Sequence, residues 1–407
     1  MKSVKLASIL FYLNSVFVVS CFVSCGSSPT EAPSLLTADI RGGMDKPGLL
    51  GLGDEIKGVT FVPLEVTTDD ASLIDGVYDY AVTDRYIYVL PVKEPRIVLF
   101  DRQGRFIRTL VKEGQGPGEF RGILPCIQVD ERNDRLFLFS NNRVWEYTLE
   151  GEFIGQSTHE YSVIYMRHIG KDRFAAISFP FQPFNGGGFG LGLFSRKGDT
   201  IAIKNDFYSF LLPHEKSGFT TSIAPAYSDA QNSVLFKTGS NDTVFCISAD
   251  RISAACVLDL KNSDAEVIRS LDVTDMSNLR IEKKDPKDIF VQDMIEFPEH
   301  YYFRLLYNQG YYIASVDKKT GKTLVEKCVM PGSIYELADA NLQHGMQGTR
   351  SYRNFPVWGR VIKDELVQVV TPYELNLYKS LRSITIPQEL DLKGEEGNPV
   401  FVFYSLI

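Results

Sequence analysis

The sequence of Ile97–Phe120, IVLFDRQGRFIRTLVKEGQGPGEF, contains two strand-like runs around a tight turn, followed by a loop rich in Gly and Pro. Ile97 and Leu99 before the turn, and Phe106, Ile107 and Leu110 after it, suit half-buried strands. Gly104 lies in the turn, where it supplies the positive φ that a short hairpin needs. This stretch therefore predicts a β-hairpin with a shaped exit loop.

The same hairpin phrase recurs along the chain. YTLEGEFIG carries Gly151 and LFSRKGDTI carries Gly198, so the three hairpin glycines are spaced 47 residues apart. Looser copies occupy Cys246–Ser253 and Ser315–Leu324. A period of roughly 40–50 residues in a strand-rich chain is typical of propeller blades. The repeat predicts an all-β protein built as a six-bladed β-propeller.

The chain can be divided into six blades with short helical insertions. The predicted blades cover about Gly76–Val111, Ile123–Gln156, Val163–Lys204, Thr220–Leu260, Ile289–Met330 and Tyr352–Ile386. The segments Asn262–Asp288 and Ser333–Gln347 have helical spacing and predict the insertions. An early strand, Val59–Val66, should pair beside the C-terminal strand, Pro399–Ile407. That pairing would close the ring and remove exposed strand edges.

Composition limits the classes of function. The chain has 407 residues, of which 44% are hydrophobic and 12% aromatic, with a formal net charge of −8. Nucleic-acid binding depends on neutralising phosphates with basic side chains. An acidic chain without a basic stripe is therefore not expected to bind nucleic acid.

The N-terminus resembles an export signal. Lys2 and Lys5 precede a largely apolar run, Leu6–Val23. The alternative is a single transmembrane anchor, because the run has about the minimum length that spans a bilayer. Asn14 and several serines dilute the run and no basic cluster follows it, so the export signal is favoured.

The end of the leader, Val19–Ser28, resembles the lipobox of bacterial lipoproteins, in which a cysteine after small residues is lipidated. We predict lipid attachment at Cys25, with Cys21 as the alternative register; the two cysteines could also belong to an ordinary cleaved leader. The predicted organisation is a signal peptide at 1–24, a flexible tether at 25–54 and the propeller at 55–407. Such a chain would be exported and anchored to the bacterial envelope by its lipid, at the outer membrane.

Four longer phrases extend the resemblance over nearly the whole mature chain: Val59–Val77, Phe100–Phe120, Ser240–Ser248 and Gly394–Ile407. They resemble the six-bladed β-propeller lipoproteins of Bacteroidota, which are NHL- or TolB-like propellers of unassigned activity. The chain departs from the pattern at Gly397, where an acidic residue is common. The resemblance implies a secreted or lipid-anchored propeller and implies no reaction.

The loop Gly114–Phe120 is the strongest local signal for a ligand site. In a propeller it would join the outer strand of one blade to the inner strand of the next, across a face where ligands commonly bind. Lys112, Gln115, Glu119 and Arg121 are the candidate ligand-facing residues. The alternative is that the glycines and proline of the loop serve only the backbone turn.

Catalytic and metal-binding motifs are not visible. The five histidines are scattered without HExxH, and GxSxG does not occur. No catalytic residue, cofactor or metal ligand is predicted, although a metal ion held by one residue per blade in the channel remains open. Cys246 and Cys256 flank a predicted hairpin, where free buried thiols are favoured over a disulfide.

The sequence therefore favours a binding or interaction module with an unknown protein or glycan partner. The alternative is an enzyme, such as a glycan-directed lyase or hydrolase, with its site at the mouth of the central channel. An enzyme should gather carboxylates, or His with carboxylates, at the ends of the inner strands with perturbed pKa values.

Overall fold

The structure is a computed structural model. It describes residues 35–48, 55–68, 71–122, 126–140, 142–159, 163, 165–177, 190–204, 226–230, 232–237, 242–261, 288–308, 310–328, 359–380 and 397–407. One compact unit, Leu36–Ile407, contains every described strand and helix. No helix among these residues is long and apolar enough to cross a membrane.

The strands form six sheets, which we number as blades in chain order. Blade 1 contains β3 (Val77–Val82), β4 (Tyr86–Pro91), β5 (Arg96–Asp101) and β6 (Phe106–Lys112). Blade 2 contains β7 (Cys126–Asp130), β8 (Arg135–Ser140), β9 (Arg143–Tyr147) and β10 (Phe153–Thr158), with a 3₁₀ turn at Glu131–Asn133. Blade 3 contains β11 (Tyr165–His168), β12 (Arg173–Ile177), β13 (Leu191–Ser195) and β14 (Thr200–Lys204).

The other three blades follow the same antiparallel order. Blade 4 contains β15 (Ala226–Ala230), β16 (Ser233–Lys237), β17 (Thr243–Ser248) and β18 (Ile252–Leu258). Blade 5 contains β19 (Phe290–Glu296), β20 (His300–Tyr307), β21 (Gly310–Asp317) and β22 (Thr323–Cys328). Blade 6 contains β23 (Gly359–Ile362), β24 (Glu365–Val370), β25 (Val400–Leu406) and β2 (Ile56–Pro63).

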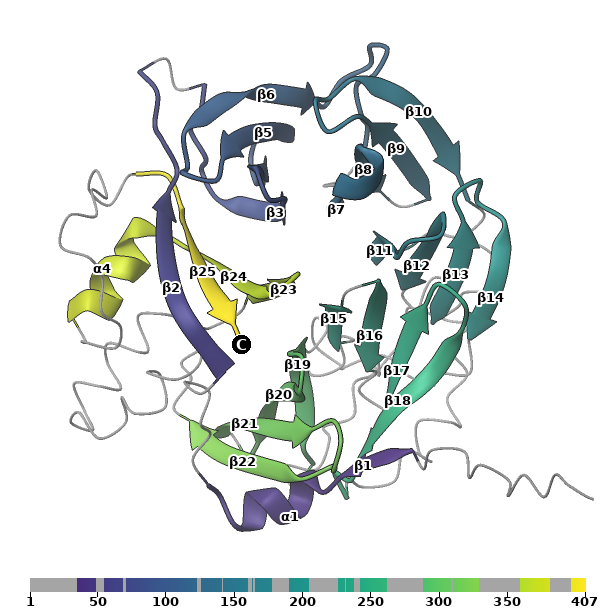
Figure 1. Cartoon of the computed structure of the whole chain (residues 1–407), viewed down its shortest axis with the longest axis vertical. Coiled ribbons are helices and arrows are strands. Elements are labelled where there is room, and N and C mark those ends of the chain that lie inside the picture. The colour runs from purple at the N-terminus through teal and green to yellow at the C-terminus, as the bar shows by residue number, and fades with distance from the viewer. Residues whose placement is uncertain are drawn as a thin grey trace, which may run out of the picture. The chain divides into compact units, whose positions relative to one another are not determined.

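The blades are arranged in a ring (Figure 1), which confirms the predicted six-bladed β-propeller. The first strand of each blade lies nearest the centre, and the last strand lies at the rim. Blade 6 closes the ring, because β2, which precedes blade 1 in the chain, pairs antiparallel with the C-terminal strand β25. Their register runs from Ile56 opposite Leu406 to Pro63 opposite Val400, so the predicted pairing of the two chain ends is confirmed.

The core lies between neighbouring blades. Tyr88 and Leu99 of blade 1 pack in one buried cluster with Leu138 and Tyr147 of blade 2. Blade 6 contributes Phe401 and Phe403 to a cluster shared with blade 1. Middle strands such as β4 and β8 read as apolar runs because both of their faces are covered by neighbouring sheets.

The repeated hairpin glycines contact the preceding blade. Gly104, Gly151, Gly198 and Gly321 have φ values of 82°, 86°, 95° and 73°, in the left-handed region. A Cβ at Gly198 would lie 2.9 Å from the carbonyl oxygen of Thr158, at the end of the preceding outer strand. A Cβ at Gly104 would overlap the carbonyl oxygen of Pro63 in the same way. The period seen in the sequence therefore reflects both turn conformation and contact between blades.

Part of the predicted tether belongs to the propeller. Leu36–Ala38 forms β1, which pairs in parallel with β18 and adds a fifth strand to blade 4. Ile40–Asp45 forms α1, whose N-cap is Asp39. Ala38, Ile40 and Met44 are buried in the cluster shared by blades 4 and 5. These two elements are too short for their apolar spacing to stand out from a Ser- and Gly-rich segment.

Blade 6 differs from the prediction in one element. The chain after β24 forms a helix, α4 (Pro372–Ser380), where strands were expected. Thr371 and Glu374 cap it reciprocally: Thr371 Oγ1 accepts from the Glu374 amide at 3.1 Å, and Glu374 Oε2 accepts from the Thr371 amide at 2.6 Å. The sequence TPYE carries this capping box and an N1 proline, which is the signal that identifies the helix start. The predicted insertion Ser333–Gln347 lies outside the described residues, as does Asn262–Asp288 except for its last residue.

The described cysteines Cys126, Cys246 and Cys256 are free thiols. In the β17–β18 pair, Cys246 faces Ser253 and Cys256 faces Val244, so the two cysteines do not oppose each other. Burial raises the pKa of Cys256 to about 12. The preference for free thiols over a disulfide is confirmed.

Candidate functional site

The innermost strands bring charged side chains from three blades together at the centre of the ring. Asp79 comes from β3, Arg167 from β11 and Arg360 from β23. The pairing of β3 with β4 shifts register between Val77 and Asp79, so Asp79 lies directly after a β-bulge. Such a bulge re-aims a side chain, which accounts for a carboxylate in an inner strand. We call Asp79, Arg167 and Arg360 the channel cluster.

The Asp79 carboxylate is buried and fully engaged. Its Oδ1 accepts from the Tyr80 amide at 2.9 Å and forms an ion pair with Arg360 Nη1. Its Oδ2 accepts from the Ile127 amide of blade 2 at 2.7 Å. One side chain therefore connects blades 1, 2 and 6 around the centre.

Arg360 combines a structural role with access to solvent. Its Nη1 also donates to the Tyr80 carbonyl at 3.1 Å, and its guanidinium lies 4.8 Å from the centre of the Tyr80 ring. The Tyr80 hydroxyl donates to the Val367 carbonyl at 2.8 Å, which fixes the ring. The Arg360 side chain nevertheless keeps 33% of its exposure, so a ligand can reach it.

Arg167 adds a second positive charge to the same place. Burial, and after it the charge of Arg360, lower the pKa of its guanidinium to about 9, and the carboxylate of Asp79 opposes both effects. These three groups act on each other electrostatically across blades 1, 3 and 6. The channel cluster thus consists of two guanidinium groups and one carboxylate.

Asp293 occupies an equivalent position in blade 5. It follows a register shift between Val291 and Asp293, and its Oδ1 accepts from the Met294 amide at 2.9 Å, as Asp79 does from Tyr80. Burial raises the pKa of this carboxyl to about 6, and the positive charge of Arg304 opposes the shift. Asp293 can therefore gain or lose a proton near neutral pH.

Replacing Asp293 with Asn should change how stability depends on pH. The folded chain holds the Asp293 proton up to about pH 6, whereas an unfolded aspartate releases it near pH 4. Wild-type stability should therefore fall, relative to Asp293→Asn, as pH rises from about 4 to about 6. The relative loss should reach about 2–3 kcal/mol, measured by urea unfolding at pH 4 and pH 7. A difference between the two proteins that does not vary with pH would contradict this pKa.

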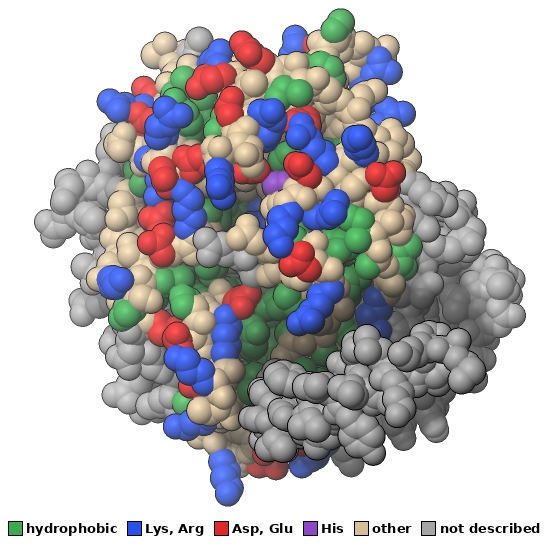
Figure 2. All heavy atoms as spheres, turned by 45° about the vertical axis from the view of Figure 1, so that its right-hand side comes forward, with side chains coloured by type: hydrophobic (Ala, Val, Ile, Leu, Met, Phe, Trp, Pro, Cys, Tyr) green, Lys and Arg blue, Asp and Glu red, His purple; other side chains and the backbone are tan. Residues whose placement is uncertain are grey.

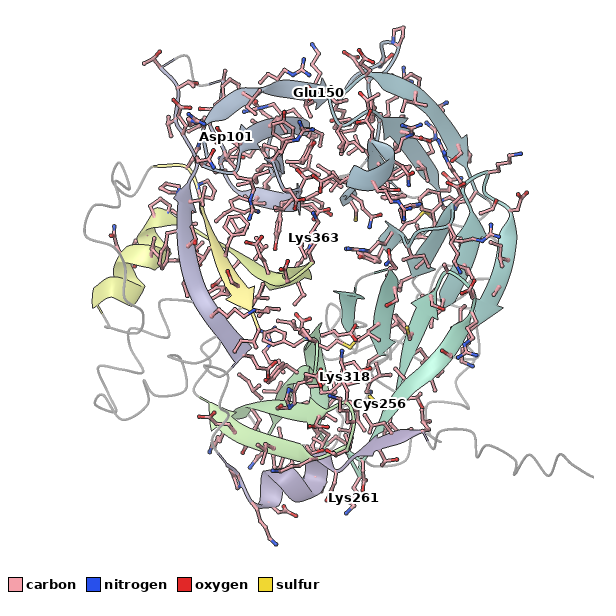
Figure 3. The ribbon with its side chains drawn as sticks, viewed as in Figure 1. Asp101, Glu150, Cys256, Lys261, Lys318 and Lys363 are labelled. Atoms are coloured by element: carbon pink, nitrogen blue, oxygen red, sulfur yellow. The ribbon has the colours of Figure 1, made fainter. Side chains whose placement is uncertain are left out.

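The opposite end of the central strands carries another set of charges. Lys363, in the β23–β24 turn, pairs with Asp84 of blade 1 and with Glu131 of blade 2, the latter at 2.9 Å. Burial opposes the charge of Lys363, but hydrogen bonds to these carboxylates outweigh it and raise the pKa of Lys363. Figure 3 shows Lys363 close to the centre of the ring. These charges are balanced by their partners and tie the turns of three blades together.

The side chains of the loop Gly114–Phe120, which was predicted as a ligand face, and of its neighbours Lys112 and Arg121 mainly contact the loop itself. Glu119 Oε2 accepts from the Gly116 amide at 2.7 Å, and Arg121 donates to the carbonyls of Gly114 at 3.1 Å and Gln115 at 3.2 Å. Lys112 Nζ lies 4.0 Å from Glu119 Oε1. These contacts favour the interpretation that the loop serves the backbone turn.

The same loop also packs against the next blade at the rim. A Cβ at Gly118 would lie 3.0 Å from Phe153 Cβ, at the start of β10.

The sequence reasoning missed Asp79, Arg167 and Arg360 because they share no motif. The available signal was charge in short strands that open a blade, as in VYDYAV and YMRH.

A cavity of about 830 Å³ lies between blades 2 and 3. Its lining includes Glu146 and Gln156 of blade 2 and Asp172 and Arg196 of blade 3. Arg196 Nε donates to Glu146 Oε2 at 3.0 Å, and its Nη1 lies 3.7 Å from Asp172 Oδ1, so positive and negative charges match here. Figure 2 shows Lys and Arg interspersed with Asp and Glu over the face that it views, without a patch of one sign.

Two histidines lie beside carboxylates. His168 Nδ1 is 3.5 Å from Asp130 Oδ2, and His300 Nδ1 is 3.0 Å from Glu55 Oε1. Burial lowers the pKa of His168, and Asp130 opposes that shift. Within the described part of the chain, no three His, Cys, Asp or Glu side chains are placed to hold a metal ion.

The ring of six sheets closed by the two chain ends defines the protein as a six-bladed β-propeller. The chain belongs to the family described as "Domain of unknown function (DUF4934)", whose model matches residues 35–405. The match begins beside β1, in agreement with the assignment of β1 and α1 to the propeller. A comparison with curated proteins gives no match.

Solved structures share the fold at low sequence identity. A protein of Bacteroides fragilis NCTC 9343, whose name describes it as a candidate exported protein, is similar with 14% identity and a TM-score of 0.61. That match covers 91% of this chain and 99% of the other. A chain from a nidogen/laminin complex matches with 9% identity and a TM-score of 0.33, over 66% of this chain and 92% of its own length.

Proposed function

We propose that this protein is a ligand-binding module of the bacterial envelope whose ligand site is the channel cluster. The observation that carries the proposal is the convergence of Asp79, Arg167 and Arg360 from blades 1, 3 and 6. Charged groups from separate blades cost free energy to bring together away from water. A ligand with a glycan or peptide backbone and polar groups would use that arrangement.

The strand order supports this location. In each blade, the connection between the second and third strands and the connection to the next blade leave from the same face. The long connections 178–190, 205–225, 259–289, 329–358 and 371–399 are all of these two kinds. Asp79 and Arg360 lie near the first residues of β3 and β23, at the end facing these connections. These connections therefore begin and end at the end of the strands where Asp79 and Arg360 lie.

Binding to a defined panel of glycans and peptides tests the proposal. The purified wild-type protein should bind at least one member of the panel without cleaving it. Arg360→Gln should not bind that ligand. Arg102→Gln is the matched control, because Arg102 is also partly buried and pairs with a carboxylate, Glu365, at 2.7 Å, but in an outer hairpin. Equal retention by Arg360→Gln and wild type would rule out the channel cluster as the site. Circular dichroism and melting confirm that each variant is folded.

The envelope location is proposed on two grounds. The leader resembles a lipoprotein signal, and a protein of the same fold is described as a candidate exported protein. A lipid on Cys25 would hold the propeller at a membrane surface, at the outer membrane, without a spanning helix. The segment from Cys25 to β1, which begins at Leu36, is then the tether.

Incorporation of an alkyne-labelled fatty acid during expression tests the anchor. Wild type and Cys21→Ala should carry the label and partition with membranes. Cys25→Ala should lose both properties, because the acylated atom is absent. Label that disappears in Cys21→Ala and persists in Cys25→Ala would move the attachment to the other register. Unlabelled wild type would refute the anchor.

The second candidate function is a glycan-directed lyase or hydrolase, and Asp293 is the observation that favours it. Its raised pKa suits a general acid or base. Glycoside hydrolysis generally needs a second carboxyl group about 5–10 Å away. Product analysis on the retained glycans distinguishes the two functions: cleavage that stops in Asp293→Asn identifies an enzyme, and intact glycans identify a binding module.

A further inference from the structure

We propose that the cavity between blades 2 and 3 is a second binding site, in which an extended peptide with an acidic side chain adds to blade 2 along β10. This site is separate from the channel cluster and does not depend on the function proposed for that cluster. The inference follows from three observations: the strand that the chain itself adds to blade 4, the position of the cavity along β10, and the charges in the cavity.

Blade 4 shows how an outer strand of this propeller accepts an added strand. β1 pairs in parallel with β18, the outer strand of the antiparallel four in that blade. The pairing continues past the end of β18, since the Asp259 amide donates to the Ala38 carbonyl at 2.7 Å. A Cβ at Gly321 would lie 2.9 Å from the Thr37 carbonyl oxygen, so β1 also contacts the hairpin of blade 5. An extended segment can therefore fill the space between two neighbouring blades at the rim.

β10 offers the same kind of edge in blade 2. It is the outer strand of its sheet (Figure 1), and no described strand pairs with its outer side. In such a strand, alternate residues direct their amide and carbonyl groups away from the sheet, where an extended peptide can bond to them. A register shift lies between Phe153 and Gly155, so the regular edge covers residues 155–158. This stretch is at least as long as β1.

The cavity between blades 2 and 3 runs along this edge. Its lining includes residues 154–158 of blade 2 and, from blade 3, residues 172–174, 195–197 and 199. Pockets that hold ligands commonly have volumes of about 300–1,000 Å³, and this cavity has about 830 Å³. No atom lies within 4 Å of the place that a Cβ of Gly155 would occupy, so the space beside the strand is open. An added strand would thus lie between β10 and the β13–β14 hairpin, as β1 lies between β18 and the hairpin of blade 5.

The charges in the cavity favour a peptide with an acidic side chain. Arg196 is paired with two carboxylates of the lining. Arg173 and Lys197 also line the cavity, and neither forms an ion pair within the described part of the chain. The remaining carboxylate, Asp199, accepts a hydrogen bond from the Ser195 hydroxyl at 2.8 Å. Two basic groups and one carboxylate are therefore left without an ion pair, and an acidic side chain would complement the excess positive charge.

Selection from a displayed library of random eight-residue peptides tests this inference. The library is depleted on Gly155→Trp, whose indole would project from the cavity wall, and then bound to wild type. We expect the recovered peptides to carry Asp or Glu. A synthetic copy should bind wild type and Gly155→Ala equally in fluorescence polarisation. Gly155→Trp should weaken binding by about 10-fold or more, because its side chain occupies the space of the added strand.

A pair of arginine variants tests the role of charge. Arg173→Gln should weaken peptide binding by about 3–10-fold, the effect of losing a partly exposed ion pair. Arg132→Gln is the matched control, because it removes an exposed positive charge of blade 2 that does not line the cavity. It should bind the peptide as wild type does. Equal binding by Arg173→Gln and Arg132→Gln would show that the cavity does not recognise an acidic side chain.

N-methylation of the synthetic peptide tests the strand pairing itself. A strand bonds to its neighbour through the amides of alternate residues only. Methyl groups on one alternate set of peptide amides should therefore abolish binding, and methyl groups on the other set should not. Equal effects of the two sets would show that the peptide does not bind as an added strand.

The outcomes also separate this site from the channel cluster. Arg360→Gln should bind the peptide as wild type does, because Arg360 does not line this cavity. The inference would be overturned if no recovered peptide preferred wild type over Gly155→Trp, or if binding were lost in Arg360→Gln. Melting curves check that each variant is folded, and Gly155→Ala provides a second variant at the same position that leaves the cavity open.

Discussion

Replacing Asn398 with Leu should lower the free energy of unfolding by about 3–5 kcal/mol, because two buried backbone groups and one partly buried carbonyl lose their partner. Asn398 is 3% exposed. Its Nδ2 donates to the carbonyls of Glu65 at 2.7 Å and Ser72 at 2.8 Å, and its Oδ1 accepts from the Ile74 amide at 2.8 Å. The side chain thus fastens the segment after β2 to the start of β25, where the ring closes.

Urea unfolding of Asn398→Leu and of Asn133→Ala measures this effect. Asn133 is exposed and its side chain makes one hydrogen bond, from Nδ2 to Asp130 Oδ2 at 2.7 Å, so its replacement should cost no more than about 1 kcal/mol. Asn398→Asp should also be destabilised, because a second carboxylate oxygen would face the two carbonyls in place of the donating amide. If Asn398→Leu were as stable as Asn133→Ala, these hydrogen bonds would not hold the closure.

The second large effect is expected at Gly104, where alanine should destabilise the chain by about 2–4 kcal/mol. The residue has a φ of 82°, which alanine adopts only at a cost. A Cβ would also overlap the Pro63 carbonyl oxygen, a backbone atom that cannot rotate away. Blade 1 would have to shift relative to the end of β2, opening the seam beside blade 6.

Gly155→Ala is the matched control. Gly155 lies in β10 without a positive φ, and no atom lies within 4 Å of the place that its Cβ would occupy. Its replacement should leave the melting temperature unchanged or raise it slightly, since alanine has less backbone freedom to lose than glycine. Equal melting temperatures for the two variants would show that contact between the hairpin and the preceding blade contributes little.

The repeat and the closure could be predicted because they depend on local sequence. Gly104, Gly151 and Gly198 recur at a fixed spacing, since each blade needs the same left-handed turn against its neighbour. The C-terminal strand is apolar up to its end, so it was expected to be covered by a neighbouring strand. That strand is β2. These features follow from the backbone of a single hairpin or strand.

The channel cluster could not be predicted because it depends on the ring. Asp79, Arg167 and Arg360 lie far apart in the sequence, and each is an isolated charge in a short strand. Only closure of six blades around a common centre brings them together. By contrast, α4 could have been predicted, because Thr371, Pro372 and Glu374 form a recognisable helix start.

The central claim, that the channel cluster is the ligand site, is tested most directly by a crystal structure of the chain with a glycan or peptide that the binding panel identifies. The account predicts that this ligand contacts Arg360 in the central channel and that it is absent from crystals of Arg360→Gln. A ligand found only in the cavity between blades 2 and 3, or nowhere in the ring, would contradict it.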